Sequence, residues 1–69
     1  MKVGDEVILI VHGAGVTSEE DEHYIEFIND EKILLKEDDR VYKNYGGTYQ
    51  TSPSDDPFFG FWFEIKEMK

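Results

Sequence analysis

The sequence has no cysteine, so disulfide bonds cannot contribute to its stability. Its only histidines are His12 and His23, which are too few for a zinc site built from four nitrogen and sulfur ligands. The acidic clusters lack the alternating Asp-x-Asp order of a dedicated calcium loop. We therefore predict neither a metal site nor a cofactor. Because reducing compartments disfavour disulfides, we expect a cytoplasmic protein.

Long hydrophobic runs are also missing. The apolar run Val7–Val11 is too short for the core of a signal peptide or for a membrane-spanning segment. We therefore expect no association with a membrane.

Basic residues are few: seven lysines and arginines stand against sixteen aspartates and glutamates, for a formal charge of −9. Such a surface repels the phosphates of DNA and RNA, so direct nucleic-acid binding is not expected. The acidity has two interpretations. It can keep a small hydrophobic domain in solution, or it can imitate the phosphates of nucleic acid and occupy the site of a basic protein. Candidate phosphate surrogates are Glu19, Glu20, Glu22, Asp38 and Asp39.

At 69 residues the chain has room for a single domain, residues 1–69. A chain of this size buries only about 60% of its unfolded surface, which leaves little net stability. Disulfides and a structural metal are not expected to supply the difference. Dense aromatic packing, and association with copies of the chain or with a partner protein, are the remaining sources of stability, and we expect association.

The first half of the chain predicts strands separated by turns. Val7–Val11 is apolar at every position, as expected for a strand covered on both faces. The glycine-rich residues 12–15 end it. Ile25 and Phe27 alternate with polar residues, and a turn at residues 29–30 leads to a second apolar run at residues 33–35, which indicates a hairpin. Residues 17–23 are expected to form an acidic loop, with a short helix as the alternative because of their capping-box spacing.

The second half of the chain contains one short strand, a long loop and one clear strand. Residues 40–43 suggest the short strand, and the Gly, Pro and Ser content of residues 44–57 indicates a loop. Residues 58–66 alternate in polarity. Their side chains divide into a core face with Phe59, Phe61, Phe63 and Ile65, and a second face that includes Phe58 and Trp62.

About five short strands with tight turns predict an all-β domain, either a small barrel or a strongly bent antiparallel sheet. Closing the sheet into a barrel would also protect its edges.

The most plausible function on these grounds is non-catalytic protein binding. Trp62 and Phe58 lie on the face of the last strand that the core does not need, and Tyr45 and Tyr49 interrupt an otherwise polar loop. Residues 12–15 (His-Gly-Ala-Gly) resemble the oxyanion-hole turn of α/β-hydrolases, but the Gly-x-Ser-x-Gly elbow of those enzymes is absent. We therefore expect a binding module rather than an enzyme.

One family resemblance extends over residues 2–41. Lys2-Val3-Gly4-Asp5-x-Val7, then Gly13-x-Gly15-Val16, then residues 26–39 resemble the C-terminal half of the small co-chaperonins, which form a ring that caps the bacterial chaperonin. The resemblance implies a β-barrel within an oligomer. The N-terminal strand and the mobile loop of that family have no counterpart here, so the resemblance does not extend to the capping function. The opening Val-Gly-Asp-x-Val is also common in SH3-like barrels.

Overall fold

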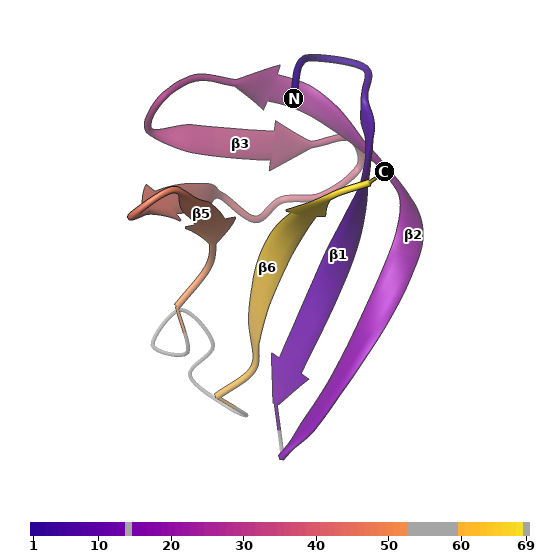
Figure 1. Cartoon of the computed structure of the whole chain (residues 1–69), viewed down its shortest axis with the longest axis vertical. Helices are drawn as coiled ribbons and strands as arrows, with labels where there is room; N and C mark the ends of the chain where they lie inside the picture. Colours follow the sequence, from indigo (N-terminus) through magenta and orange to yellow (C-terminus); the bar gives the residue numbers. More distant parts are fainter. Residues whose placement is uncertain (14, 53–59, 69) are drawn as a thin grey trace.

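Six strands form the regular structure of residues 1–13, 15–52 and 60–68, which are the residues that the computed structural model describes. The strands are β1 (Glu6–Gly13), β2 (Val16–Ile28), β3 (Lys32–Leu35), β4 (Tyr42–Tyr45), β5 (Thr48–Gln50) and β6 (Trp62–Glu67). Each strand pairs antiparallel with the next, and β6 pairs with β1 to close a barrel (Figure 1). The predicted all-β small barrel is confirmed, with six strands instead of about five. Within the described residues no helix is long and apolar enough to cross a membrane.

The core lies inside the barrel. Its buried hydrophobic residues are Val7, Leu9, Ile25, Ile33, Leu35, Tyr42 and Ile65, with Ile28, Tyr49 and Phe63 packed against them. The predicted alternation of the last strand is confirmed for its described residues, because Ile65 is buried and Phe63 packs on the core. The expectation that Val7–Val11 is covered on both faces is wrong. Ile8 and Ile10 are only half-buried, because alternate side chains of β1 point out of the barrel.

The expected loop at residues 44–57 begins with a hairpin instead. β4 continues to Tyr45, and β5 pairs with it through Asn44↔Tyr49 and Tyr45↔Thr48. Gly46 and Gly47, at φ 65° and 100°, form the connection, as a tight hairpin turn with two positive φ values requires. Asp55, Asp56 and Phe58 lie outside the described residues.

Residues 17–23 are neither loop nor helix, which corrects both expectations. They belong to β2 and pair with β1, for example Glu20 with Leu9 and Thr17 with His12. Carboxylate side chains disfavour strands only weakly, and pairing along an apolar strand overrides that preference. Because all residues from Val16 to Glu22 are exposed, their charges stay in water.

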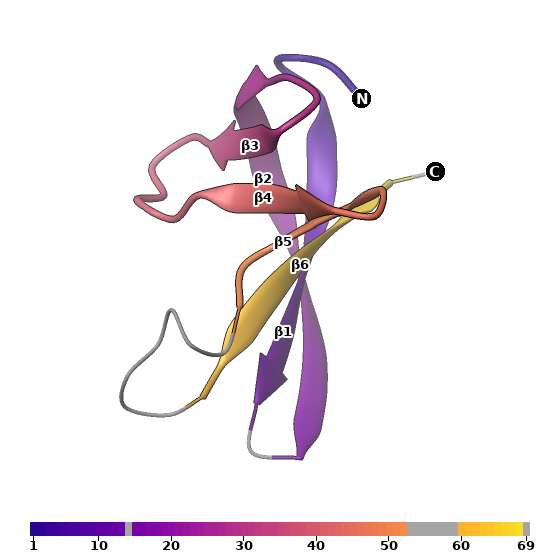
Figure 2. The same cartoon turned by 90° about the vertical axis from the view of Figure 1, so that its left-hand side faces the viewer.

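Two bulges bend β2, so that its first part pairs with β1 and its last part with β3. The register between β1 and β2 shifts between Val7 and Leu9, and the register between β2 and β3 shifts between Ile25 and Phe27, where their pairing begins. Glu22 lies in the first bulge with a φ of 64°. Such bulges increase local bending and twist. As a result, residues 10–13 of β1 and 16–22 of β2 extend beyond β3 and β4 as a two-stranded projection, here named the wing, with β6 beside β1 (Figure 2).

Candidate protein-binding surface

One face of β1 and β6 points away from the core. Its residues follow from the register, in which Ile10 pairs with Glu64 and His12 with Trp62. Residues directly opposite each other in an antiparallel pair share a face, and the next residue of β6, Ile65, is buried in the core. The surface named here the outer face consists of Ile8, Ile10, His12, Trp62 and Glu64, and the exposed Lys66, which pairs with Ile8, borders it. All five side chains are half-buried, so apolar atoms of Ile8, Ile10 and Trp62 meet solvent.

Trp62 is held in place by two contacts of His12. The two rings stack with centroids 3.8 Å apart and planes 7° from parallel. His12 Nε2 lies 3.1 Å from Glu64 Oε1, and the two side chains are 23% and 30% exposed. Sequence reasoning placed Trp62 on this face correctly. It treated His12 only as a remote catalytic candidate and Ile8 and Ile10 as buried, so it missed three members of the outer face.

The four aromatic residues predicted to bind a partner are not gathered in one place. Tyr49 packs on the core, and its hydroxyl donates a hydrogen bond to the Asn29 carbonyl oxygen at 2.7 Å. Tyr45 is 49% exposed and pairs with Thr48. Because Gln50 pairs with Glu64, Thr48 and Trp62 are offset by about four residues, or roughly 13 Å, along the sheet. Phe58 lies outside the described residues.

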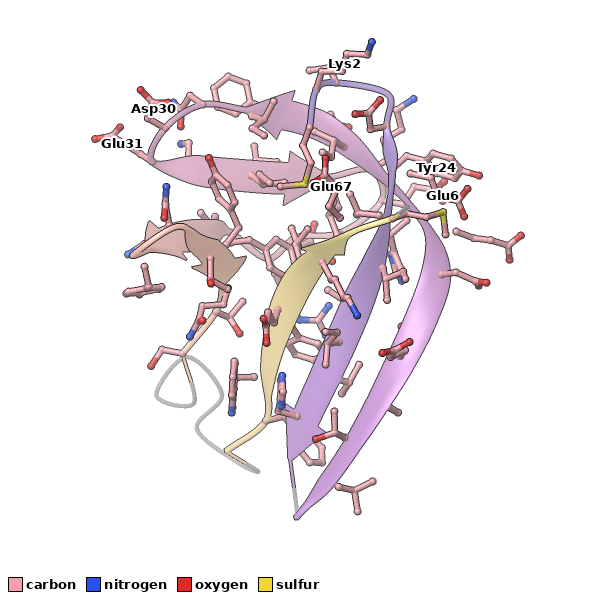
Figure 3. All side chains as sticks on the ribbon, viewed as in Figure 1. Lys2, Glu6, Tyr24, Asp30, Glu31 and Glu67 are labelled. Carbon is pink, nitrogen blue, oxygen red and sulfur yellow. The ribbon has the colours of Figure 1, made fainter. Side chains whose placement is uncertain are left out.

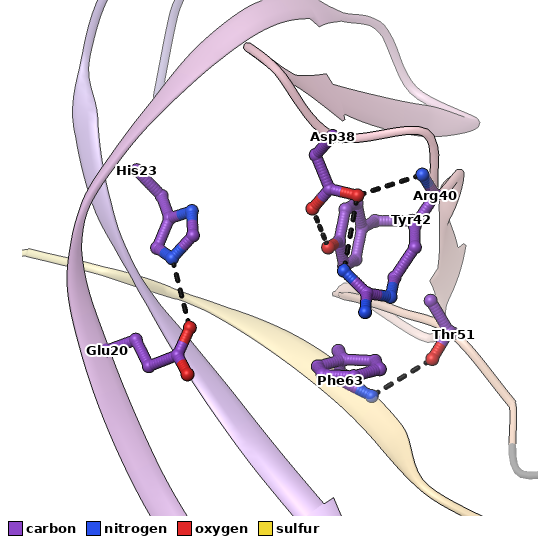
Figure 4. Close-up of polar contacts among 7 residues, drawn as sticks. All are labelled: Glu20, His23, Asp38, Arg40, Tyr42, Thr51 and Phe63. Atoms are coloured by element: carbon purple, nitrogen blue, oxygen red, sulfur yellow. Dashed lines mark hydrogen bonds and ion pairs between the residues drawn. The ribbon is translucent and has the colours of Figure 1, made fainter.

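Three of the candidate phosphate surrogates lie on the wing. Glu19, Glu20 and Glu22 are exposed along β2, and Glu20 Oε1 is 3.3 Å from His23 Nε2 (Figure 4). Glu22 donates its backbone N–H to Glu6 Oε2 at 3.0 Å, toward β1. Other carboxylates lie elsewhere, including Asp30 and Glu31 at the turn between β2 and β3 (Figure 3). The acidic surface therefore has one continuous run, on β2, and scattered charges around the barrel.

Asp38 takes part in an internal network instead. Its side chain is 8% exposed and accepts hydrogen bonds from the Tyr42 hydroxyl, the Arg40 N–H at 2.9 Å and Arg40 Nη1 at 3.3 Å (Figure 4). The Arg40 guanidinium lies over the Phe63 ring, 3.9 Å from its centroid. Burial, and next the Asp38 carboxylate, raise the pKa of Tyr42 well above its usual range. Asp38 therefore orders the connection between β3 and β4, while Asp39 beside it is exposed.

A shallow groove of about 640 Å³ separates β2 from that connection. It is lined by Glu22, His23, Lys36, Glu37, Asp38, Asp39 and Arg40. The hydrogen bond from the Lys36 N–H to the Tyr24 carbonyl oxygen, at 2.9 Å, lies just beyond the end of β3. The groove begins there, where the chain after β3 separates from β2. The sequence pattern does not predict that Glu22 lies near residues 36–40. The bend of β2 places them together.

In residues 1–13, 15–52 and 60–68, no three His, Asp or Glu side chains are arranged to hold a metal ion. Comparison with protein-family models, with curated proteins and with solved structures gives no match to this chain. The structure therefore shows a small acidic β-barrel, and the comparisons assign it to no family. The resemblance to the co-chaperonins stays a prediction.

Proposed function

We propose that the chain is a non-catalytic protein-binding module, and that the outer face is its contact surface. The observation that carries this proposal is the row of half-exposed apolar side chains, Ile8, Ile10 and Trp62, on the side of the sheet opposite to the core. Buried aromatic residues and neighbouring aliphatic residues are the usual energetic centre of protein interfaces. Glu19 of β2 and Glu64 of β6, which flank Ile10 on its two sides, supply the polar rim.

The geometry around Trp62 supports a binding role. Because His12 stacks on the indole and is itself bonded to Glu64, Trp62 has little freedom left to lose when a partner covers it. The same contacts engage the His12 imidazole, which favours a structural use of this residue over a catalytic one. A cytoplasmic location remains part of the proposal.

The test is affinity capture from the native host with the wild-type chain and two outer-face variants, Trp62→Ala and Ile10→Thr. Tyr45→Ala is the matched control, because it removes an exposed aromatic residue that lies elsewhere. We expect one partner to be retained by the wild type and the control, and to bind each outer-face variant at least about tenfold more weakly, a loss of about 1.4 kcal/mol. Equal retention of the same proteins by all four chains would reject the proposal. Circular dichroism confirms that each variant is folded.

A second function, inhibition of a nucleic-acid-binding protein by phosphate mimicry, is favoured by one observation. Residues 19–22 are four consecutive carboxylates on an extended strand. A strand spaces its side chains regularly, about 3.3 Å per residue on alternating faces, and so presents rows of negative charge as a nucleic-acid backbone does. Glu19, Glu20 and Glu22 remain candidate surrogates, with Asp39 on the groove rim. The internal contacts of Asp38 make it unsuitable for this role.

This alternative predicts competition with nucleic acid. The chain should displace a DNA or RNA duplex from its partner, more weakly as salt increases, and Glu19→Gln with Glu20→Gln and Glu22→Gln should abolish the displacement. A partner that binds the chain and nucleic acid at the same time would exclude mimicry and leave the protein-binding proposal intact.

A further inference from the structure

One side of β2 is open along the wing. β3 pairs with β2 only between Ile25 and Ile28, and among the described residues no strand pairs with that side of β2 from Val16 to Glu22. Figure 1 shows β2 as the outermost strand there. The exposure of every side chain from Val16 to Glu22 agrees with this arrangement.

An open strand edge presents alternate backbone N–H and C=O groups that have no partner in the sheet. The edge is regular from Val16 to Glu20, where the register with β1 does not shift, and it ends at the bulge, where the Glu22 N–H donates to Glu6. Extended segments of other proteins add to such edges and take the place of the missing strand.

The groove between β2 and residues 36–40 continues the path of an added strand. It is bounded on one side by Glu22 and His23, where the open edge ends, and on the other by Asp39 and Arg40. A segment paired along residues 16–22 would therefore reach this groove at Glu22. The edge and the groove therefore form one elongated surface.

The charge of the edge selects the occupant. Pairing with the same edge of a second copy would bring two runs of four carboxylates together, and like charges on adjacent strands are destabilising. A lysine- or arginine-rich strand instead places opposite charges across from Glu19, Glu20 and Glu22, on both faces of the wing. The net charge of −9 also speeds its approach.

We propose that the open edge of β2 binds an extended basic segment of a partner protein by strand addition. This inference rests on the proposed protein-binding function and names the chemistry and the binding mode of the partner. The outer face and the open edge are adjacent through Glu19, so a single partner can use both.

The test uses the whole chain and a short synthetic peptide of alternating lysine and valine, observed by NMR and amide hydrogen exchange. A peptide of the same sequence with every backbone nitrogen methylated keeps the charge and loses the donors. We expect slowed exchange at alternate amides of residues 16–22 and chemical-shift changes at His23 and Arg40 in the groove. The methylated peptide should bind at least about tenfold more weakly than the unmethylated one.

Charge is tested separately with matched variants. Glu19→Gln with Glu20→Gln should weaken peptide binding, whereas Glu26→Gln with Glu31→Gln, which removes two charges away from the wing, should leave it nearly unchanged. Equal binding of the two peptides, shifts confined to the outer face, or no binding of either peptide would overturn strand addition. Each of these results leaves the outer-face proposal standing, because that proposal is decided by the Trp62 and Ile10 variants.

Discussion

At the scale of single residues, the most constrained polar group is the Tyr42 hydroxyl. The residue is fully buried, and its hydroxyl donates to Asp38, a carboxylate that also accepts from Arg40. Both the burial and the negative neighbour oppose formation of a tyrosinate. An acidic residue four positions before a tyrosine is only a weak sequence signal for this pair, and the sequence pattern instead makes Asp38 a candidate phosphate surrogate.

The raised pKa of Tyr42 predicts alkaline destabilisation. Tyrosine is neutral in both states at neutral pH, so its contribution is fully present below the unfolded-state pKa of about 10. Above that pH the unfolded chain loses the proton first, and the free energy of unfolding falls as pH rises toward the folded-state pKa. Urea denaturation from pH 8 upward should show this fall. In Tyr42→Phe, expected to cost about 1–3 kcal/mol at pH 8, the fall should be smaller; an unchanged slope would contradict the assignment.

Gly13 is a residue at which an added methyl group should be harmful. A Cβ there would lie 1.6 Å from Phe61 Cδ1 and 2.8 Å from its Cγ, so the ring covers the glycine closely. Gly13→Ala should therefore displace Phe61 and destabilise the fold by about 1–3 kcal/mol. Thermal unfolding measures the effect, and Phe61→Leu in the same chain should recover part of it. Full stability of Gly13→Ala alone would show that the contact yields easily.

At the scale of elements, the bulge in β2 makes a distinct prediction. Glu22 adopts a positive φ that costs an ordinary residue about 1–2 kcal/mol, and glycine avoids that cost but loses about 0.5–1 kcal/mol in chain entropy. Glu22→Gly should thus leave stability unchanged or raise it by up to about 1 kcal/mol. Glu20→Gly, in regular strand, should lower it by about 1 kcal/mol. Chemical denaturation compares the two, and an equal loss in both would contradict the bulge geometry.

The elements also show how much of the fold could be predicted from the sequence alone. Alternation predicted β6, and the turn at Asn29 predicted the hairpin of β2 and β3, because both signals are local. The turn is built as expected, with Asn29 Oδ1 accepting from the N–H groups of Glu31 at 2.8 Å and Lys32 at 2.9 Å. The Gly46-Gly47 pair carried a hairpin signal that the loop-like composition around it obscured.

The extended form of residues 17–23 could not be predicted in that way. Their composition gives no periodic pattern, and the strand exists because β1 pairs along it. The open edge and the groove follow from this strand and from its bend at Glu22. Those parts of the candidate site were accessible only from the tertiary structure.

At the scale of the whole molecule, the expected self-association stays a prediction. Electrostatic repulsion between copies should limit its strength. The open edge of β2 repels its own copy, so we expect the outer face, with Trp62, to mediate any dimer. Sedimentation equilibrium should show association that strengthens with salt, because salt screens the repulsion between molecules of charge −9. Trp62→Ala should reduce it. A monomer at every salt concentration would restrict the module to heterologous partners.

The outer-face proposal is tested most directly by NMR spectra of the Ile8 and Ile10 methyl groups and the Trp62 indole in complex with the partner captured from the host. We predict that these signals shift or broaden on binding, and that the Tyr45 ring on the β4–β5 hairpin does not. Unchanged Ile8, Ile10 and Trp62 signals in a complex that perturbs Tyr45 would contradict the proposal.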